Sequence, residues 1–144
     1  MPILLALLVG CAPDSVQVPS PSPAEGASGL CRSLVQQLPD SLLGKNRVSV
    51  TPDSPLVAAW GSPTIALRCG VPRPDGLAPD SELLAVNDVA WLPEPPEQPT
   101  TYTSVGRQVY VELLIPASYE QPAEALVRVS DLIKEHLPAK ESGL

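Results

Sequence analysis

The residues in this sequence whose chemistry is distinctive are few, and the three cysteines come first. Cys11 ends the string LVGC, which has the form of a lipobox: small residues before the cleaved bond fit a narrow peptidase site, and the cysteine thiol takes a diacylglyceryl group. The apolar run 3–9 would be the hydrophobic region of a secretion signal. We therefore predict a lipoprotein signal segment over 1–11, with Cys11 as the lipidated residue. The alternative is an apolar N-terminus with a chance cysteine. No Lys or Arg precedes the run, so we expect the natural start to lie further upstream.

Residues 12–28 are rich in proline and serine and have no periodic apolar face. Such a segment buries too little surface to become ordered, and proline favours an extended chain. We predict a disordered tether over 12–28, between a lipid anchor and a folded domain. The alternative is a disordered N-terminus without that role.

Cys31 and Cys69 remain once Cys11 is assigned to the anchor. Outside the cytoplasm disulfides persist, so these two thiols can pair. A buried pair of free thiols and a redox couple are the alternatives. Redox pairs usually have the spacing C-x-x-C, which these residues lack. We predict a structural disulfide that joins the first helix to the sheet.

Residues that could support catalysis or metal binding do not form a recognisable pattern. His136 is the single histidine, and nothing in the sequence indicates that it meets a serine and a carboxylate. The acidic residues are scattered, and Glu94 and Glu97 lie in a proline-rich loop that gives no support for paired-carboxylate catalysis. The net charge of −7 argues against nucleic-acid binding, which depends on clustered Lys and Arg. We therefore predict no catalytic residue, no cofactor, no metal site and no nucleic-acid partner.

A different group of residues is typical of binding surfaces, which are enriched in aromatic residues and arginine. Arg68 projects from a predicted strand on the side opposite Cys69, and Tyr110 alternates with apolar neighbours on another strand. Trp91 could lie on the same side, depending on the register of its hairpin. We predict a possible binding face formed by Arg68, Trp91 and Tyr110. The alternative is that the tryptophans complete the core.

The elements that must position these residues follow from periodicity and turn signals. Apolar residues at helical spacing predict one helix near each end, and Asn87-Asp88 and Gly106-Arg107 are turn dipeptides between apolar runs. The predicted elements are helix 29–38, strands 47–50 and 64–69, hairpins 82–94 and 101–116, and helix 121–137.

This order of elements predicts an α+β fold. We expect an antiparallel sheet of about five strands, with the N-terminal and C-terminal helices packed on one face. The folded domain would span 29–138 and be followed by a mobile tail over 139–144. No run of about 18 apolar residues occurs, which argues against a transmembrane helix.

Three strings carry a resemblance to a known family: AAWGSPTIALRCGVPRP, LLAVNDVAWLPE and VGRQVYVELLIP. In this order they resemble an actinobacterial family of secreted lipoproteins of unknown function, the domain of unknown function 3515 type. The resemblance covers about residues 30–137. It implies a membrane-anchored, extracytoplasmic protein and supplies no catalytic residues.

From these observations we expect a lipoprotein on the outer face of a bacterial cytoplasmic membrane. Its partners would be the membrane, through the lipid anchor, and an envelope protein or cell-wall component. The expected role is non-enzymatic binding. The alternatives are a small enzyme acting on wall or lipid material and a structural accessory subunit of a membrane complex. A deep polar pocket with two close acidic groups would favour the enzyme, and an apolar patch rimmed by charge would favour the binding domain.

Overall fold

The computed structural model describes residues 15–144, so the predicted signal segment and Cys11 lie outside the described residues. Within 15–144, two helices and nine strands follow one another in the order β1 (Ser15–Gln17), α1 (Glu25–Gln36), β2 (Ser41–Leu42), β3 (Lys45–Thr51), β4 (Val57–Trp60), β5 (Ile65–Val71), β6 (Leu84–Val86), β7 (Val89–Glu94), β8 (Thr101–Val105), β9 (Tyr110–Leu114) and α2 (Pro122–His136).

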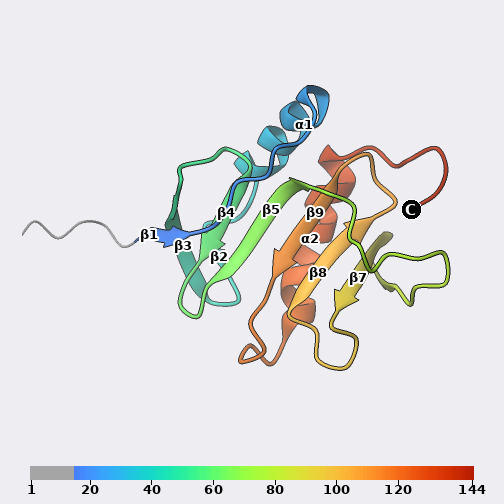
Figure 1. Cartoon of the computed structure of the whole chain (residues 1–144). Helices are drawn as coiled ribbons and strands as arrows, with labels where there is room; N and C mark the ends of the chain where they lie inside the picture. Colours follow the sequence, from blue (N-terminus) through green and yellow to red (C-terminus); the bar gives the residue numbers. More distant parts are fainter. Residues whose placement is uncertain (1–14) are drawn as a thin grey trace, which may run out of the picture.

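All of these strands belong to one sheet with the order β1-β3-β4-β5-β9-β8-β7-β6, and the short β2 pairs with β3 outside this path (Figure 1). The sheet is mixed, because β1 runs parallel to β3 while the other pairs are antiparallel. The expected α+β fold with about five antiparallel strands is therefore wrong: the described chain is a mostly-sheet fold with nine strands in one mixed sheet and two helices. The additional strands β1, β2 and β4 have two to four residues, too few for a clear alternation of apolar and polar residues, and β1 also pairs with a segment 34 positions away.

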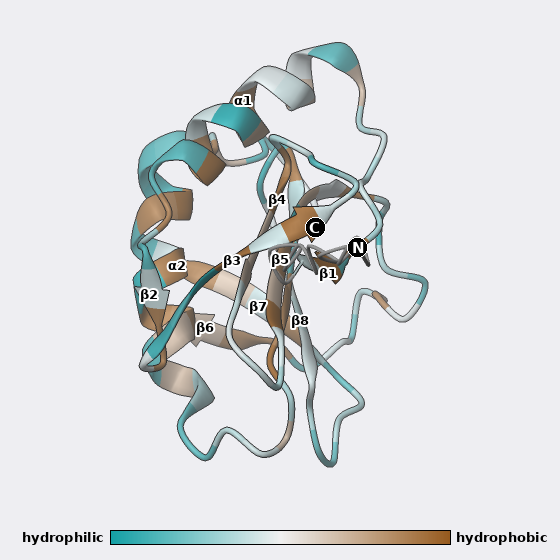
Figure 2. Cartoon of the chain, turned by 90° about the vertical axis from the view of Figure 1, so that its left-hand side faces the viewer, coloured by the Kyte–Doolittle hydropathy of each residue, from teal (hydrophilic) through white to brown (hydrophobic). Residues whose placement is uncertain are grey.

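The main hydrophobic core lies between the sheet and the two helices (Figure 2). Leu34 of α1 and Val129 and Ile133 of α2 are fully buried against the inward-facing residues of the strands. The helices also contact each other, α1 contacts β5, and α2 contacts β6 and β7. We call the opposite side of the sheet the helix-free face.

The first helix begins earlier than the apolar periodicity predicts, at Glu25 instead of residue 29. Glu25 lies in the first turn, where a negative charge interacts favourably with the helix dipole. Ala24 occupies the N-cap position without a side-chain cap, and Ser28 lies inside the helix. A helical turn without buried apolar residues leaves no periodic pattern to detect.

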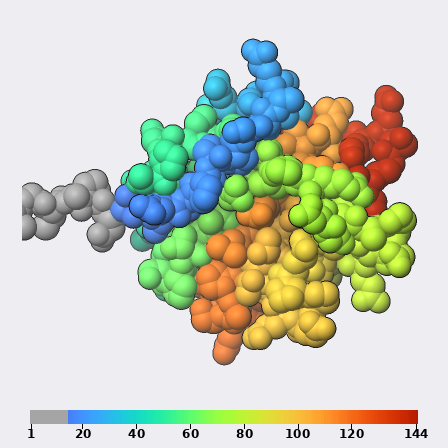
Figure 3. Space-filling view, viewed as in Figure 1, coloured from blue at the N-terminus to red at the C-terminus, as the bar shows by residue number. Residues whose placement is uncertain are grey.

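Residues 15–28 are ordered, in contrast to the predicted tether. Val16 and Val18 pack with Val57 and Ala66 on the helix-free face, and β1 pairs with β3. Figure 3 shows the blue N-terminal segment lying across this face. Composition does not reveal this order, because the contacts join residues 34 or more positions apart.

The strand β4 has no counterpart among the predicted elements, because all four of its residues are buried and the pattern shows no alternation. Trp60 ends this strand and is fully buried. Its indole nitrogen donates a hydrogen bond to the carbonyl of Pro39 at 2.9 Å. Trp60 is therefore a core residue.

The two predicted turns have different outcomes. Asn87 and Asp88 connect β6 and β7 directly, and both have positive φ values, 46° and 65°, as a two-residue hairpin turn requires. Between β8 and β9 the connection covers 106–109 and is wider than the predicted Gly106-Arg107 turn. This wider loop pairs with the chain end: Arg107 bridges to Ala139, and the amide of Lys140 donates to the carbonyl of Gly106 at 2.9 Å.

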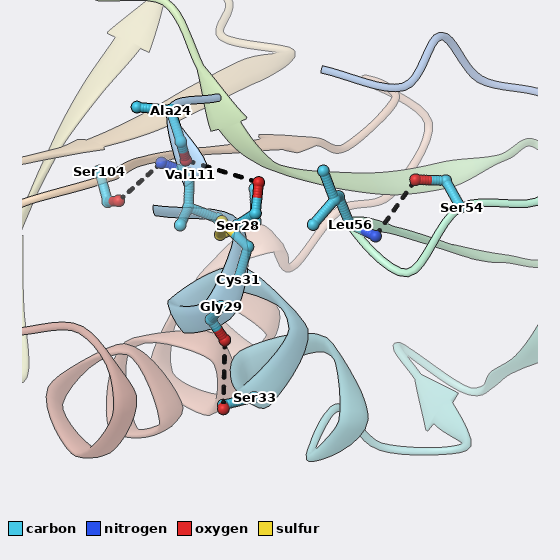
Figure 4. Close-up of a disulfide and its surroundings, with 10 residues drawn as sticks. Ala24, Ser28, Gly29, Cys31, Ser33, Ser54, Leu56, Ser104 and Val111 are labelled. Carbon is cyan, nitrogen blue, oxygen red and sulfur yellow. Dashed lines mark hydrogen bonds between the residues drawn. A yellow bond between two sulfur atoms is a disulfide. The ribbon is translucent and has the colours of Figure 1, made fainter. Parts of the chain in front are cut away.

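The predicted disulfide is present. Cys31 of α1 and Cys69 of β5 are joined, both fully buried, over a sequence separation of 38 residues. Figure 4 shows the bond where the first helix meets the sheet. The bond ties α1 to the middle of the sheet.

Candidate functional site

The structure divides the three residues of the predicted binding face. Arg68 and Tyr110 share the helix-free face, because Arg68 pairs with Glu112 across β5 and β9 and Tyr110 alternates with Val111. Trp91 lies on the other side, fully buried in the main core. The prediction that Trp91 belongs to this face is wrong: the register of its hairpin directs its indole towards α2.

Arg68 is held by structural contacts. Its Nη1 lies 3.1 Å from Oε1 of Glu112, and its Nε donates to the carbonyl of Pro19 at 2.8 Å. Close by, a Cβ atom on Gly70 would lie 2.6 Å from the ring of Pro23, so the N-terminal segment passes directly over the strand. Arg68 therefore joins the sheet to the N-terminal segment that covers it.

Tyr110 belongs to a cluster of three polar side chains, of which the sequence pattern indicates only Tyr110 itself. Its hydroxyl lies 3.3 Å from Nη1 of Arg73 and 3.3 Å from Nζ of Lys140. We call Arg73, Tyr110 and Lys140 the Tyr110 cluster. They come from the loop after β5, the start of β9 and the segment after α2, so no local sequence spacing reveals them.

The Tyr110 cluster converges on a single acceptor, the main-chain oxygen of Leu144. Arg73 donates to it at 2.7 Å, Lys140 at 2.9 Å and the Tyr110 hydroxyl at 3.0 Å. In Figure 3 the red C-terminal segment lies beside the yellow-green segment that follows β5. Lys140 also lies over the Tyr110 ring, 5.3 Å from its centre. Three donors, two of them cationic, thus surround one oxygen atom.

The charges of the Tyr110 cluster are not balanced by acidic side chains. The ion pairs found within residues 15–144 involve Arg68, Lys134 and His136, and none includes Arg73 or Lys140. Burial raises the pKa of Tyr110, but the hydrogen bonds and positive charges of Arg73 and Lys140 outweigh this effect and hold its pKa below the usual value. The cluster therefore favours a negative charge in a protein whose net charge is −7.

An apolar patch adjoins these donors. Leu77, Leu92 and Val105 form a small buried cluster on the helix-free face, and both Tyr110 and the side chain of Leu144 pack against it. Leu92 also lines a cleft of about 650 Å³, whose other lining residues are Gly76, Ser81, Glu82, Pro93, Glu94, Pro95 and Pro96. Charged donors, an apolar patch and a cleft therefore meet on one part of the sheet.

A larger cleft, of about 780 Å³, lies along α2. Its lining comes from the single stretch 120–131, and all but one of these residues are exposed. No second element in its described lining faces this stretch. A ligand there would contact one side only, which makes this cleft the weaker candidate.

Residues 15–144 contain neither a metal-binding cluster nor a membrane-spanning helix. No group of three or more His, Cys, Asp and Glu side chains is placed to bind a metal ion. Neither helix has the length and apolar character needed to cross a bilayer.

The family model described as "Protein of unknown function (DUF3515)" matches residues 4–142. The chain belongs to this family. The matched range contains all three members of the Tyr110 cluster and ends before Leu144. No curated protein and no solved structure matches the chain.

Proposed function

We propose that this protein is an extracytoplasmic lipoprotein of actinobacterial type. It is anchored to the outer face of the cytoplasmic membrane through Cys11 and binds an envelope protein or a cell-wall component without catalysing a reaction. The lipobox supports the anchor. The Cys31–Cys69 disulfide supports an oxidising compartment, where such bonds persist.

The short distance between the anchor and the domain supports close contact with the membrane surface. Only Ala12, Pro13 and Asp14 separate Cys11 from β1, and this stretch reaches at most about 14 Å when fully extended. Since β1 is the first strand in the sheet order, that edge of the domain would lie next to the lipid headgroups.

The position of the Tyr110 cluster supports a partner other than the membrane. β9 lies four strands from β1 and β7 lies six strands away, which corresponds to roughly 20–30 Å across the sheet. Figure 1 shows β1 and the C-terminus at opposite ends of the molecule. The cluster would therefore face the envelope space above the membrane.

The observation that carries the binding role is the convergence of Arg73, Tyr110 and Lys140 on one oxygen atom beside an apolar patch. Convergent charged donors next to apolar surface are typical of ligand sites. An arginine in such a site recognises carboxylate or phosphate groups.

The test combines fractionation with crosslinking in cells. A Cys11→Ala variant should leave the membrane fraction, because it lacks the acceptor thiol. A photo-crosslinking residue at Glu82, which is exposed and lines the cleft, should capture a specific partner. The same residue at Arg32, exposed on α1, is the matched control. Unchanged membrane association of the Cys11 variant would contradict the anchor, and identical crosslinks from both positions would contradict the site.

A further inference from the structure

We propose that the Tyr110 cluster is a binding site for a carboxylate group carried by an apolar residue, and that Leu144 occupies this site as an internal ligand that a partner's carboxylate displaces. This inference rests on the proposed binding function and specifies its ligand.

The polar part of the site matches a carboxylate. Three donors from three separate parts of the chain lie within 3.0 Å of one oxygen. Two of them, from Arg73 and Lys140, carry a positive charge. Hydrogen bonds from charged donors to a carboxylate are about twice as strong as neutral ones. The two cationic donors and the hydroxyl therefore match the charge and the acceptor capacity of a carboxylate.

The apolar part of the site selects the kind of residue to which the carboxylate is attached. The side chain of Leu144 packs against the patch of Leu77, Leu92 and Val105, while its main-chain oxygen receives the three hydrogen bonds. An apolar side chain and an oxygen acceptor of the same residue are therefore recognised together. A peptide that ends in an aliphatic residue presents the same two groups, and a bare phosphate presents only the charge.

Leu144 has the properties of a ligand that can leave. Its oxygen accepts the hydrogen bonds found for 141–144 within the described chain, and Glu141, Ser142 and Gly143 are exposed. Lys140 is held independently, because its amide donates to the carbonyl of Gly106. Segments with few buried contacts detach at small cost in free energy. Release of 141–144 would therefore open the site and leave the donors in place.

The experiment measures binding of the synthetic peptide Glu-Ser-Gly-Leu by calorimetry or NMR titration. The protein is compared as the full chain and as a chain that lacks 141–144. The shortened chain should bind the free-acid peptide at least about tenfold more tightly than the full chain, and it should bind the C-terminal amide about tenfold more weakly than the acid. The peptide Glu-Ser-Gly-Gly should bind roughly fivefold more weakly, because it lacks the side chain that fills the apolar patch.

Variants of the shortened chain assign the binding to the cluster. Arg73→Ala should abolish binding, and Tyr110→Phe should weaken it while preserving the ring. Lys134→Ala is the matched control, because this exposed lysine lies on α2 and pairs with Asp88. Should the shortened chain fail to fold, Leu144→Gly in the full chain provides the same comparison, and its affinity for the free-acid peptide should rise.

The proposal would be overturned if the shortened chain bound the free-acid peptide and the amide with equal affinity. It would also be overturned if the shortened and full chains bound the free-acid peptide with equal affinity. Binding of inorganic phosphate as tight as that of the peptide would overturn the ligand class, because charge alone would then suffice. These results would not affect the anchor or the partner site proposed above, which are read from fractionation and crosslinking in cells.

Discussion

The indole nitrogen of Trp91 donates a hydrogen bond to the hydroxyl of Ser130 at 2.9 Å, with both residues fully buried. Trp91 lies on β7 and Ser130 on α2, so the bond joins the sheet to the C-terminal helix. The bond gives the buried indole N–H of Trp91 an acceptor. This explains why a serine lies among the buried apolar residues of α2. It also places Trp91 in the core and not on the binding face.

Removal of the acceptor should destabilise the protein. Ser130→Ala leaves a buried indole N–H without a partner, which should lower the free energy of unfolding by about 1–3 kcal/mol. Ser33→Ala is the control, because that serine is exposed on α1, and it should change the value by less than about 0.5 kcal/mol. Urea denaturation measures both. Equal effects of the two substitutions would show that the buried bond contributes little.

The disulfide should supply much of the stability of this small domain. Closure of a loop of 38 residues corresponds to about 4 kcal/mol in the chain-entropy model. Reduction should therefore lower the midpoint of urea denaturation substantially. A Cys31→Ala, Cys69→Ala variant should start from the lower stability and not respond to reductant. A wild-type midpoint that is the same with and without reductant would contradict this role.

Gly70 should be required for the N-terminal segment to cross the sheet. Gly70 has a φ of +95° and lies under Pro23, so Gly70→Ala is expected to destabilise the protein by more than about 1 kcal/mol. Proteolysis of the residues before α1 should also become faster. Gly29→Ala is the matched control: an added methyl group there would meet nothing within 4 Å outside its own stretch of α1, and it should stabilise the helix by roughly 0.5–1 kcal/mol. A Gly70→Ala variant as stable as the parent would exclude this close approach.

The three tyrosines should ionise in a defined order. The pKa of Tyr110 is lowered, whereas burial raises the pKa of Tyr102 and of Tyr119. In an ultraviolet titration the first phenol to ionise should therefore disappear in Tyr110→Phe and shift to higher pH in Lys140→Ala. A first transition that survives Tyr110→Phe would contradict the assignment.

The lowered pKa of Tyr110 also has a consequence for stability. Between the folded pKa and the unfolded value near 10, the unfolded chain binds the proton and the native chain does not, so this group adds stability as the pH rises through that window. The contribution is lost as the pH falls through the folded pKa. Comparison of the parent with Tyr110→Phe by denaturation across this window measures it, and a parallel pH dependence in both proteins would contradict it.

Local signals in the sequence are sufficient to predict several features of the fold. The buried stripe of α2, formed by Leu126, Val129 and Ile133 and continued by Leu137, follows from helical spacing. The turn at Asn87-Asp88 follows from residues that tolerate positive φ. The pairing of Cys31 with Cys69 follows from the small number of cysteines once Cys11 is set aside.

Only the tertiary structure decided on which side of the sheet Trp91 lies. It also decided that residues 15–28 are ordered against the sheet, and that Arg73, Tyr110 and Lys140 come together. Backbone preferences and apolar periodicity act over a few neighbouring residues, so the sequence by itself determined the presence of a helix near each end, the Asn87-Asp88 turn and the resemblance of short strings to a family. Strand register and the packing of distant segments depend on contacts between residues tens of positions apart. A shift of one residue in register would move a side chain such as Trp91 to the opposite face, which is why its place was decided by the packing of β7 against α2.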